Sequence, residues 1–179
     1  MGIVIGIDLS LTATACVAFD VHGESDEPKE KVLIAGGKKR GIERVVHIER
    51  EIGRFVFNWK PELVCLESYA YSRINQAHQC GELGGVIRRR LYLDSVKWIA
   101  ISPMTVKKFS TGRGNSDKNV VMLCTYKKWG QTFLNDNEAD AYVLARIGAI
   151  LAGRNDILTA YQINAMAAPT VSYKEVLMP

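Results

Sequence analysis

Four acidic residues stand where predicted strands end or where a predicted helix begins. Asp8 and Glu67 each close a short apolar run of the kind that fills a buried strand, and Asp136 and Asp140 stand at the start of an apolar helical run. All four side chains could therefore meet at one edge of a sheet. Because gathered carboxylates repel one another unless a cation joins them, the pattern predicts a site that binds metal ions.

The spacing of the last helical run predicts that Asp140 faces inward. Leu144, Ile147 and Leu151 follow it at three- and four-residue steps, so they share its side of the helix. A carboxylate on that side is costly unless it is paired or bound to a metal, which favours the metal-ligand interpretation for Asp140. Asp136 could equally cap the helix and face water.

Oxygen ligands select magnesium or manganese over zinc, and the sequence offers no His or Cys cluster that favours another metal. The four cysteines lie 49, 15 and 44 residues apart, which matches neither a paired-thiol zinc site nor a dense disulfide framework. We expect reduced and mostly buried thiols. The three histidines are expected to be surface or packing residues: His22, His47 and His78.

The elements that would position the acids begin with an antiparallel hairpin. The pattern predicts strands over 3–9 and 13–20, a third strand over 32–35, a helix over 42–58, a fourth strand over 63–66 and a fifth over 96–101. Pro61 stops the helix. Asp8 and Glu67 thus close the first and the fourth strand.

A helix predicted over about 75–93 contains Gly81, Gly84 and Gly85. Three glycines weaken a helix, so we expect them to allow close packing against a neighbouring element. A dimer seam or a close approach to a DNA backbone is the alternative.

The remaining helices are marked by their end residues. Ser102-Pro103 caps and starts a short helix, Ser116 can cap the next one, and Gly130 ends it. The last helix begins near Asp136.

Positive charge is concentrated in one segment. The net charge is +4, but residues 88–128 carry ten Lys and Arg against two acids, which leaves the remainder at −4. A basic surface on an acidic body suggests a polyanionic partner, most commonly nucleic acid. A solvated surface with scattered lysines is the equal alternative.

The composition fits one globular domain, with 179 residues of which 47% are apolar. The longest apolar run is far shorter than the roughly 20 residues that a membrane span needs. The N-terminus reads as a strand without a charged leader, so we expect a protein that is neither exported nor membrane-bound.

Residues 3–151 resemble the RuvC-like Holliday-junction resolvases of the ribonuclease H superfamily. The resemblance rests on five segments in order: Ile5-Gly6-Ile7-Asp8, Glu67, Gly81-Glu82-Leu83-Gly84-Gly85-Val86, the basic run from Val106 to Gly112 leading to Asp117-Lys118, and Glu138-Ala139-Asp140-Ala141. No single segment is specific, but their order and spacing together are. The short chain and the Asn-Glu-Ala-Asp-Ala segment look more like the phage-borne branch than the large bacterial one.

The resemblance implies an α/β, ribonuclease H-like fold, with a five-stranded mixed sheet, its first three strands antiparallel, and helices on both faces. Residues 1–151 would form the nuclease domain, and residues 152–179 a C-terminal tail that is partly ordered or straps a partner. It also implies a homodimer that acts on branched DNA in the cytoplasm of a bacterium or a phage-infected cell.

The family's metal ligands carry over to three acids: Asp8, Glu67 and Asp140. The fourth family acid normally stands three residues before the last, where this chain has Asn137. Either Asn137 ligates as a neutral oxygen, or Asp136 or Glu138 supplies the charge. Helix geometry favours Asp136, because a four-residue step keeps it near the face of Asp140 whereas Glu138 points about 200° away.

The implied activity is metal-dependent resolution of four-way junctions, which leaves 5′-phosphate and 3′-hydroxyl ends. Two Mg²⁺ ions, with Mn²⁺ as a substitute, would lie roughly 3.5 to 4 Å apart in each active site. Asp8 would bridge both ions, Glu67 would hold one, and Asp140 with Asp136 the other.

The resemblance also implies DNA contacts. Lys107 and Lys118 match basic positions near the scissile strand, and Lys108 and Arg113 lie beside them, so we expect these four to clamp phosphates without reading sequence. Two tyrosines stand in a loop where relatives can stack an aromatic on an opened junction, although they could equally cover the core edge: Tyr69 and Tyr71.

Three alternatives remain from the sequence. The segment from Gly6 to Thr12 also resembles the phosphate-binding hairpin of the actin and sugar-kinase ATPases, but those proteins need two lobes and further glycine-rich loops. A junction-binding protein whose metal site is crippled at Asn137 would not be an enzyme. A nuclease of the same fold could act on flaps or other branches.

Overall fold

The computed structural model describes residues 2–68, 77–167 and 171–172. Six strands form one mixed sheet: β1 (Ile3–Asp8), β2 (Ala13–Asp20), β3 (Glu30–Ala35), β4 (Leu63–Glu67), β5 (Trp98–Ile101) and β6 (Val171–Ser172). Their spatial order is β3-β2-β1-β4-β5-β6. The predicted five-stranded mixed sheet with an antiparallel start is confirmed, and the two-residue β6 adds to its edge by pairing antiparallel with β5.

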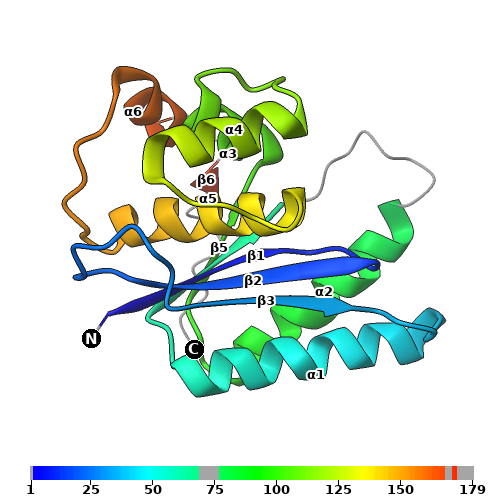
Figure 1. The fold of residues 1–179 in the computed structure, drawn as a ribbon. Coiled ribbons are helices and arrows are strands. Elements are labelled where there is room, and N and C mark those ends of the chain that lie inside the picture. Colours follow the sequence, from blue (N-terminus) through cyan, green and yellow to red (C-terminus); the bar gives the residue numbers. More distant parts are fainter. Residues whose placement is uncertain (1, 69–76, 168–170, 173–179) are drawn as a thin grey trace.

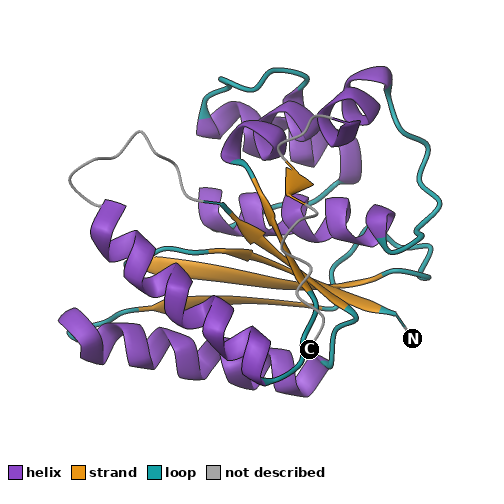
Figure 2. Ribbon diagram, turned by 180° about the vertical axis from the view of Figure 1, so that it is seen from behind, coloured by secondary structure: helices purple, strands orange, loops and turns teal. Residues whose placement is uncertain are grey.

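Helices cover both faces of the sheet (Figures 1 and 2). One face is covered by α1 (Gly41–Trp59) and α2 (Ala77–Leu93), which pack against each other. The other face is covered by α5 (Asp136–Leu151), and beyond it lie α3 (Pro103–Thr111), α4 (Lys118–Trp129) and α6 (Ala160–Ala167). Because α5 lies between the sheet and this second group of helices, nearly all of its residues from 138 to 149 are buried.

Two glycines allow α5 to lie unusually close to the sheet. A Cβ atom added at Gly6 in β1 would lie 2.0 Å from the Ala141 carbonyl oxygen of α5, which no side chain could tolerate. A Cβ atom at Gly148 of α5 would lie 2.5 Å from the Cys65 sulfur of β4. The missing side chains therefore fix the height of α5 above β1 and β4.

The structure confirms two of the predicted helix ends and corrects a third. The Ser102 hydroxyl accepts a hydrogen bond from the Thr105 amide at the start of α3, and Gly130 ends α4 in the left-handed conformation. The prediction that Ser116 caps α4 is wrong. Asp117 caps it instead, because the Ser116 hydroxyl already contacts Thr111.

The expected close packing at the glycines of α2 is wrong at two positions. A Cβ atom added at Gly81 or Gly85 would meet no atom of the described residues within 4 Å, whereas Gly84 is buried. Gly85 is exposed on the outer side of α2, and Gly81 is half-buried.

Beyond residue 151, α6 packs against α3 and buries Gln162 and Ala165. No helix in the described part of the chain is both long enough and apolar enough to cross a membrane.

A network of paired charges lies at the C-terminal end of α5. Arg146 is almost fully buried, with 4% of its side chain exposed, and its guanidinium contacts the carboxylates of Asp26 and Asp156. Arg154 lies 2.9 Å from Asp156 and also donates to the carbonyl oxygen of Gly23. The two arginines thus tie the loop between β2 and β3 to the segment after α5.

Candidate active site at the start of helix α5

Strand alternation turns Asp8 and Glu67 toward α5. Side chains on the even positions of β1 and the odd positions of β4 enter the core beneath α5, as Val4 and Cys65 do. β1 and β4 are parallel neighbours, with Ile7 paired to Leu66. The two carboxyl groups therefore come together where both strands end, and they share a hydrogen bond.

Helix α5 brings two more acids to this point. Asp140 lies close enough to Asp8 for their charges to interact, and the carbonyl of the next residue, Ala141, faces Gly6 of β1. Burial, followed by the charge of Asp8, raises the pKa of Asp140 to about 7. Asp136, one turn earlier, also acts on the pKa of Asp8 and of Asp140 through its negative charge.

Burial raises the pKa of both strand acids, and the charge of Glu67 raises that of Asp8 further. Asp8 is only 5% exposed, and burial followed by the charge of Glu67 raises its pKa well above the ordinary value. Burial also raises the pKa of Glu67, although the hydrogen bond from Asp8 partly opposes this. All four predicted acids are therefore close enough to influence one another electrostatically.

Two lysines supply the nearest positive charge. The Lys118 ammonium at the start of α4 contacts the carboxylate of Asp136, and this hydrogen bond raises the pKa of Lys118. Lys107 of α3 lowers the pKa of both Glu67 and Asp140 by its charge. Both lysines predicted to lie near a scissile strand thus lie beside the acids.

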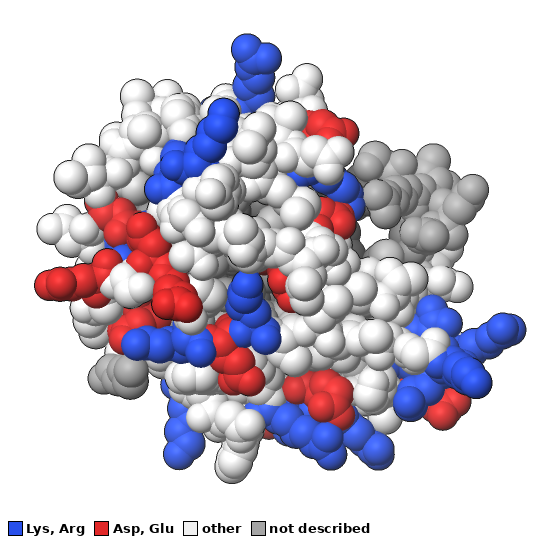
Figure 3. Space-filling model, in the orientation of Figure 1, with Lys and Arg blue, Asp and Glu red and all other residues white. Residues whose placement is uncertain are grey.

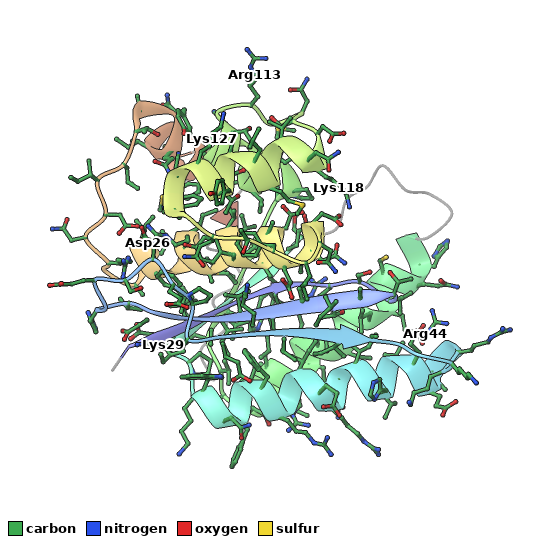
Figure 4. The ribbon with its side chains drawn as sticks, viewed as in Figure 1. Asp26, Lys29, Arg44, Arg113, Lys118 and Lys127 are labelled. Carbon is green, nitrogen blue, oxygen red and sulfur yellow. The ribbon has the colours of Figure 1, made fainter. Side chains whose placement is uncertain are left out.

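The other predicted DNA contacts are placed differently. Arg113, in the loop between α3 and α4, points outward and away from the acids, whereas Lys118 lies on the side of the molecule where α5 begins (Figure 4). Lys108 is half-buried on α3. Tyr69 and Tyr71 lie outside the described residues.

The structure separates the three candidates for the fourth acidic position. The Glu138 carboxylate is buried and accepts a hydrogen bond from the Leu134 amide, so it is committed to the helix start. The Asn137 amide nitrogen donates to the Ala13 carbonyl oxygen at 2.6 Å. Capping of α5 is done by Asn135, which leaves Asp136 free of that role. Asp136 is therefore the candidate whose carboxylate faces the other acids.

The donor set fits a hard divalent cation. In the described part of the chain, no three His, Cys, Asp or Glu side chains are already drawn together as a metal site. The acids at the ends of β1 and β4 and on α5 nevertheless offer only oxygen atoms, and burial followed by the neighbouring carboxylates raises the pKa values of Asp8 and Asp140. Binding a magnesium-like ion would relieve that repulsion.

Sequence reasoning missed three features of this region. Lys118 was expected to contact phosphate, whereas in the structure it contacts Asp136. A contact between side chains of two different helices leaves no local pattern in the sequence. Gly6 carries a signal, because glycine within a buried strand marks a close backbone approach. The basic run Lys38-Lys39-Arg40 was also visible and lies at the same end of the sheet.

No family model matches the chain. It is 26% identical over 149 residues to the protein named crossover junction endodeoxyribonuclease RuvC of Synechococcus sp. (strain WH7803), covering 81% of this chain and 96% of that protein. The protein of the same name from Prochlorococcus marinus (strain NATL1A) is also 26% identical, covering 83% and 98%. In fold, the chain is similar to T. thermophilus RuvC in complex with a Holliday junction substrate, with a TM-score of 0.72, 23% identity, and coverage of 85% and 95%.

Proposed function

We propose that this chain, which belongs to the RuvC family, is a structure-selective endonuclease that resolves four-way (Holliday) junctions by hydrolysing phosphodiester bonds. The observation that carries the proposal is the convergence of buried and half-buried acids from β1, β4 and α5 at one end of the sheet, beside two lysines. The comparisons support it, because they relate over four-fifths of the chain to proteins with this name and fold.

We infer that Asp8, Glu67, Asp136 and Asp140 would hold two Mg²⁺ ions, for which Mn²⁺ could substitute. When bound, such ions activate a water molecule and stabilise charge on the attacking and leaving oxygens. The expected products are a 5′-phosphate and a 3′-hydroxyl. Asn137 keeps its amide on the Ala13 carbonyl, so we assign it no charge-bearing role.

The protein's own groups position the scissile phosphate. Lys118 is half-exposed, so its ammonium can reach from Asp136 toward a phosphate oxygen. Lys107 lies on the same side, and together the two lysines offset the repulsion between DNA and the acids. Lys108 and Arg113 would contact the backbone farther from the bond that is cut.

The proposal includes a homodimer, because resolving a junction requires cuts in two strands that a twofold axis relates. Residues 1–151 are assigned to the nuclease domain and residues 152–179 to a C-terminal tail. We propose the cytoplasm of a bacterium or a phage-infected cell as its location.

The test is a cleavage assay on a synthetic four-way junction, beside a linear duplex of the same sequence and a flap. Each substrate is incubated with Mg²⁺, with Mn²⁺ and with a chelator, and Asp8→Asn is the matched control. We expect paired nicks in the junction that need the metal and are lost in the variant. Binding without cleavage would instead indicate an architectural protein, and preference for the flap would indicate a nuclease with another substrate.

A further inference from the structure

A second basic surface lies apart from the lysines of the acidic site. It is made of Lys38, Lys39 and Arg40 in the turn between β3 and α1, and we call it the β3–α1 patch. Lys38 and Arg40 are exposed and Lys39 is half-exposed. Basic side chains gather over the start of α1 at the lower right of Figure 3, and Arg44 marks the same corner in Figure 4.

The patch has no acidic partner of its own. Among the described residues, none of its three side chains lies within 4.0 Å of a carboxylate, although ion pairs form elsewhere on α1, such as that between Arg54 and Glu51. The adjacent Glu43 is exposed and forms no ion pair with the patch. Three cations thus project a net positive field into solvent.

The position of the patch is costly for helix α1. Helices usually start with a residue whose side chain caps the first amides, and positive charge near those amides is unfavourable. Here Arg40 stands at the N-cap position and makes no side-chain cap. Gly37 and Gly41, on either side of the three cations, both have positive φ angles. A helix N-terminus with uncapped amides and nearby positive charge is unfavourable for the helix itself, which suggests that these residues serve a function.

The turn is held rigidly next to the acidic site. Arg44 donates from its Nε atom to the Lys39 carbonyl oxygen at 2.7 Å. A Cβ atom added at the buried Gly36 would lie 2.7 Å from the carbonyl oxygen of Leu11 and 2.8 Å from Arg44. Leu11 belongs to the turn that directly follows Asp8, so the patch and the acids lie at the same end of the sheet, on different strands.

We propose that the β3–α1 patch binds the phosphate backbone of a duplex arm that extends from the cleavage point. This inference rests on the proposed function, because the acidic site fixes where the DNA strand passes. Lys107 and Lys118 would hold the strand from the side of α3 and α4, and the patch would hold an arm from the side of β3 and α1. Arg44 is a positioning residue that keeps the turn in place.

Such contacts act through charge and carry no sequence information, so the patch should add affinity and salt dependence on any DNA sequence. The contribution should also depend on arm length. Once an arm is too short to reach the patch, the patch has nothing to bind.

The experiment compares the triple variant Lys38→Ala, Lys39→Ala, Arg40→Ala with a control variant of the same charge change, Arg50→Ala, Arg54→Ala, Lys97→Ala. Arg50 and Arg54 lie farther along α1, and Lys97 precedes β5 at the opposite end of the sheet. Binding and cleavage are measured over a range of salt concentrations, on junctions whose arms are shortened stepwise. Thermal melts verify that both variants are folded.

We expect the patch variant to bind long-armed junctions about tenfold more weakly, with a salt slope lower by about 2 to 3, because each phosphate contact contributes about 0.9. On the shortest arms it should match the wild type, and the control should match at every length. Equal behaviour of patch variant and wild type on long arms would overturn the proposal. So would an equal loss in the control, or a loss that persists on the shortest arms.

The result also separates this inference from the proposed function. If the wild type cleaves no junction but the patch variant still loses affinity for long linear duplex, the patch binds DNA and the assigned activity is wrong. If the wild type resolves junctions and the patch variant is unchanged, the activity stands and the patch is not a DNA contact.

Discussion

Helix α5 has a cluster of charged side chains at each end, and the two clusters are built in opposite ways. At its N-terminal end, Asp136 and Asp140 meet the acids of β1 and β4, so negative charge accumulates. At its C-terminal end, Arg146 lies between Asp26 and Asp156, so charges are matched. The same helix thus carries one cluster that holds the fold together and one that strains it.

The difference teaches where to look for function. The charge of the buried Arg146 is matched within the protein by two carboxylates, although its Nε atom has no hydrogen-bond partner among the described residues. Removing such a cation leaves its partners unpaired and lowers stability. Carboxylates with raised pKa values destabilise the fold at neutral pH. Such groups are common at functional sites, where a bound ligand offsets the destabilisation. Charge balance therefore distinguishes the structural cluster from the one that we propose to be functional.

The largest expected effect is on catalysis at the unbalanced end. Asp8→Asn should lower the cleavage rate by about 10³-fold or more, because it removes the proposed central metal ligand and with it about 4 kcal/mol of transition-state stabilisation. Junction binding should persist. Single-turnover cleavage and gel-shift assays measure the two separately. Asp26→Asn, at the balanced end, is the control and should cleave at the wild-type rate; wild-type cleavage by Asp8→Asn would remove Asp8 from the site.

The balanced end should respond in stability instead. Arg146→Met keeps an unbranched side chain but removes the buried guanidinium between Asp26 and Asp156, which then pair with Arg154 alone. The free energy of unfolding should therefore fall by up to about 3 kcal/mol. Urea unfolding of wild type and variant measures the change. The folded fraction of the variant should still cleave junctions, and a loss of cleavage without a loss of stability would contradict the division between the two ends.

The free energy of unfolding should depend on pH through Asp140, at the N-terminal end of α5. Because the pKa of Asp140 is raised from 3.8 to about 7 in the folded state, its ionisation costs stability, and the cost grows as pH rises from about 4 to above 7. Asp140→Asn should therefore stabilise the metal-free protein by up to about 4 kcal/mol at pH 8 and by nothing below pH 4. Urea unfolding at both pH values measures this, and an equal gain at both would show that charge is not the cause.

Much of the fold and the positions of the four acids could be predicted because their signals are local. Asp8 and Glu67 end apolar runs, and the three- and four-residue steps after Asp140 define a helix face. The paired end could not be predicted, since Asp26 and Arg146 lie 120 residues apart and neither belongs to a periodic pattern. The predicted N-cap of α4 was wrong by one residue, because Ser116 and Asp117 are both good capping residues. The contact between Ser116 and Thr111 decides between them and leaves no signal in the sequence.

The smallest expected effect lies at Asn137, where the family pattern and the structure predict opposite outcomes. If the metal site is weakened because Asn137 stands where the family has an acid, Asn137→Asp should raise the cleavage rate. In the structure the amide of Asn137 donates to the Ala13 carbonyl at 2.6 Å, and a carboxylate there would set one oxygen against another. We expect a loss of about 1 to 2 kcal/mol in stability and slower cleavage, because α5 loses its bond to the start of β2. Urea unfolding and single-turnover cleavage test both, with Asn137→Ala as the control, which loses the donor without adding charge. Faster cleavage by Asn137→Asp than by the wild type would mean that the unbalanced cluster lacks a negative charge, and that Asp136, held by Lys118, does not supply it.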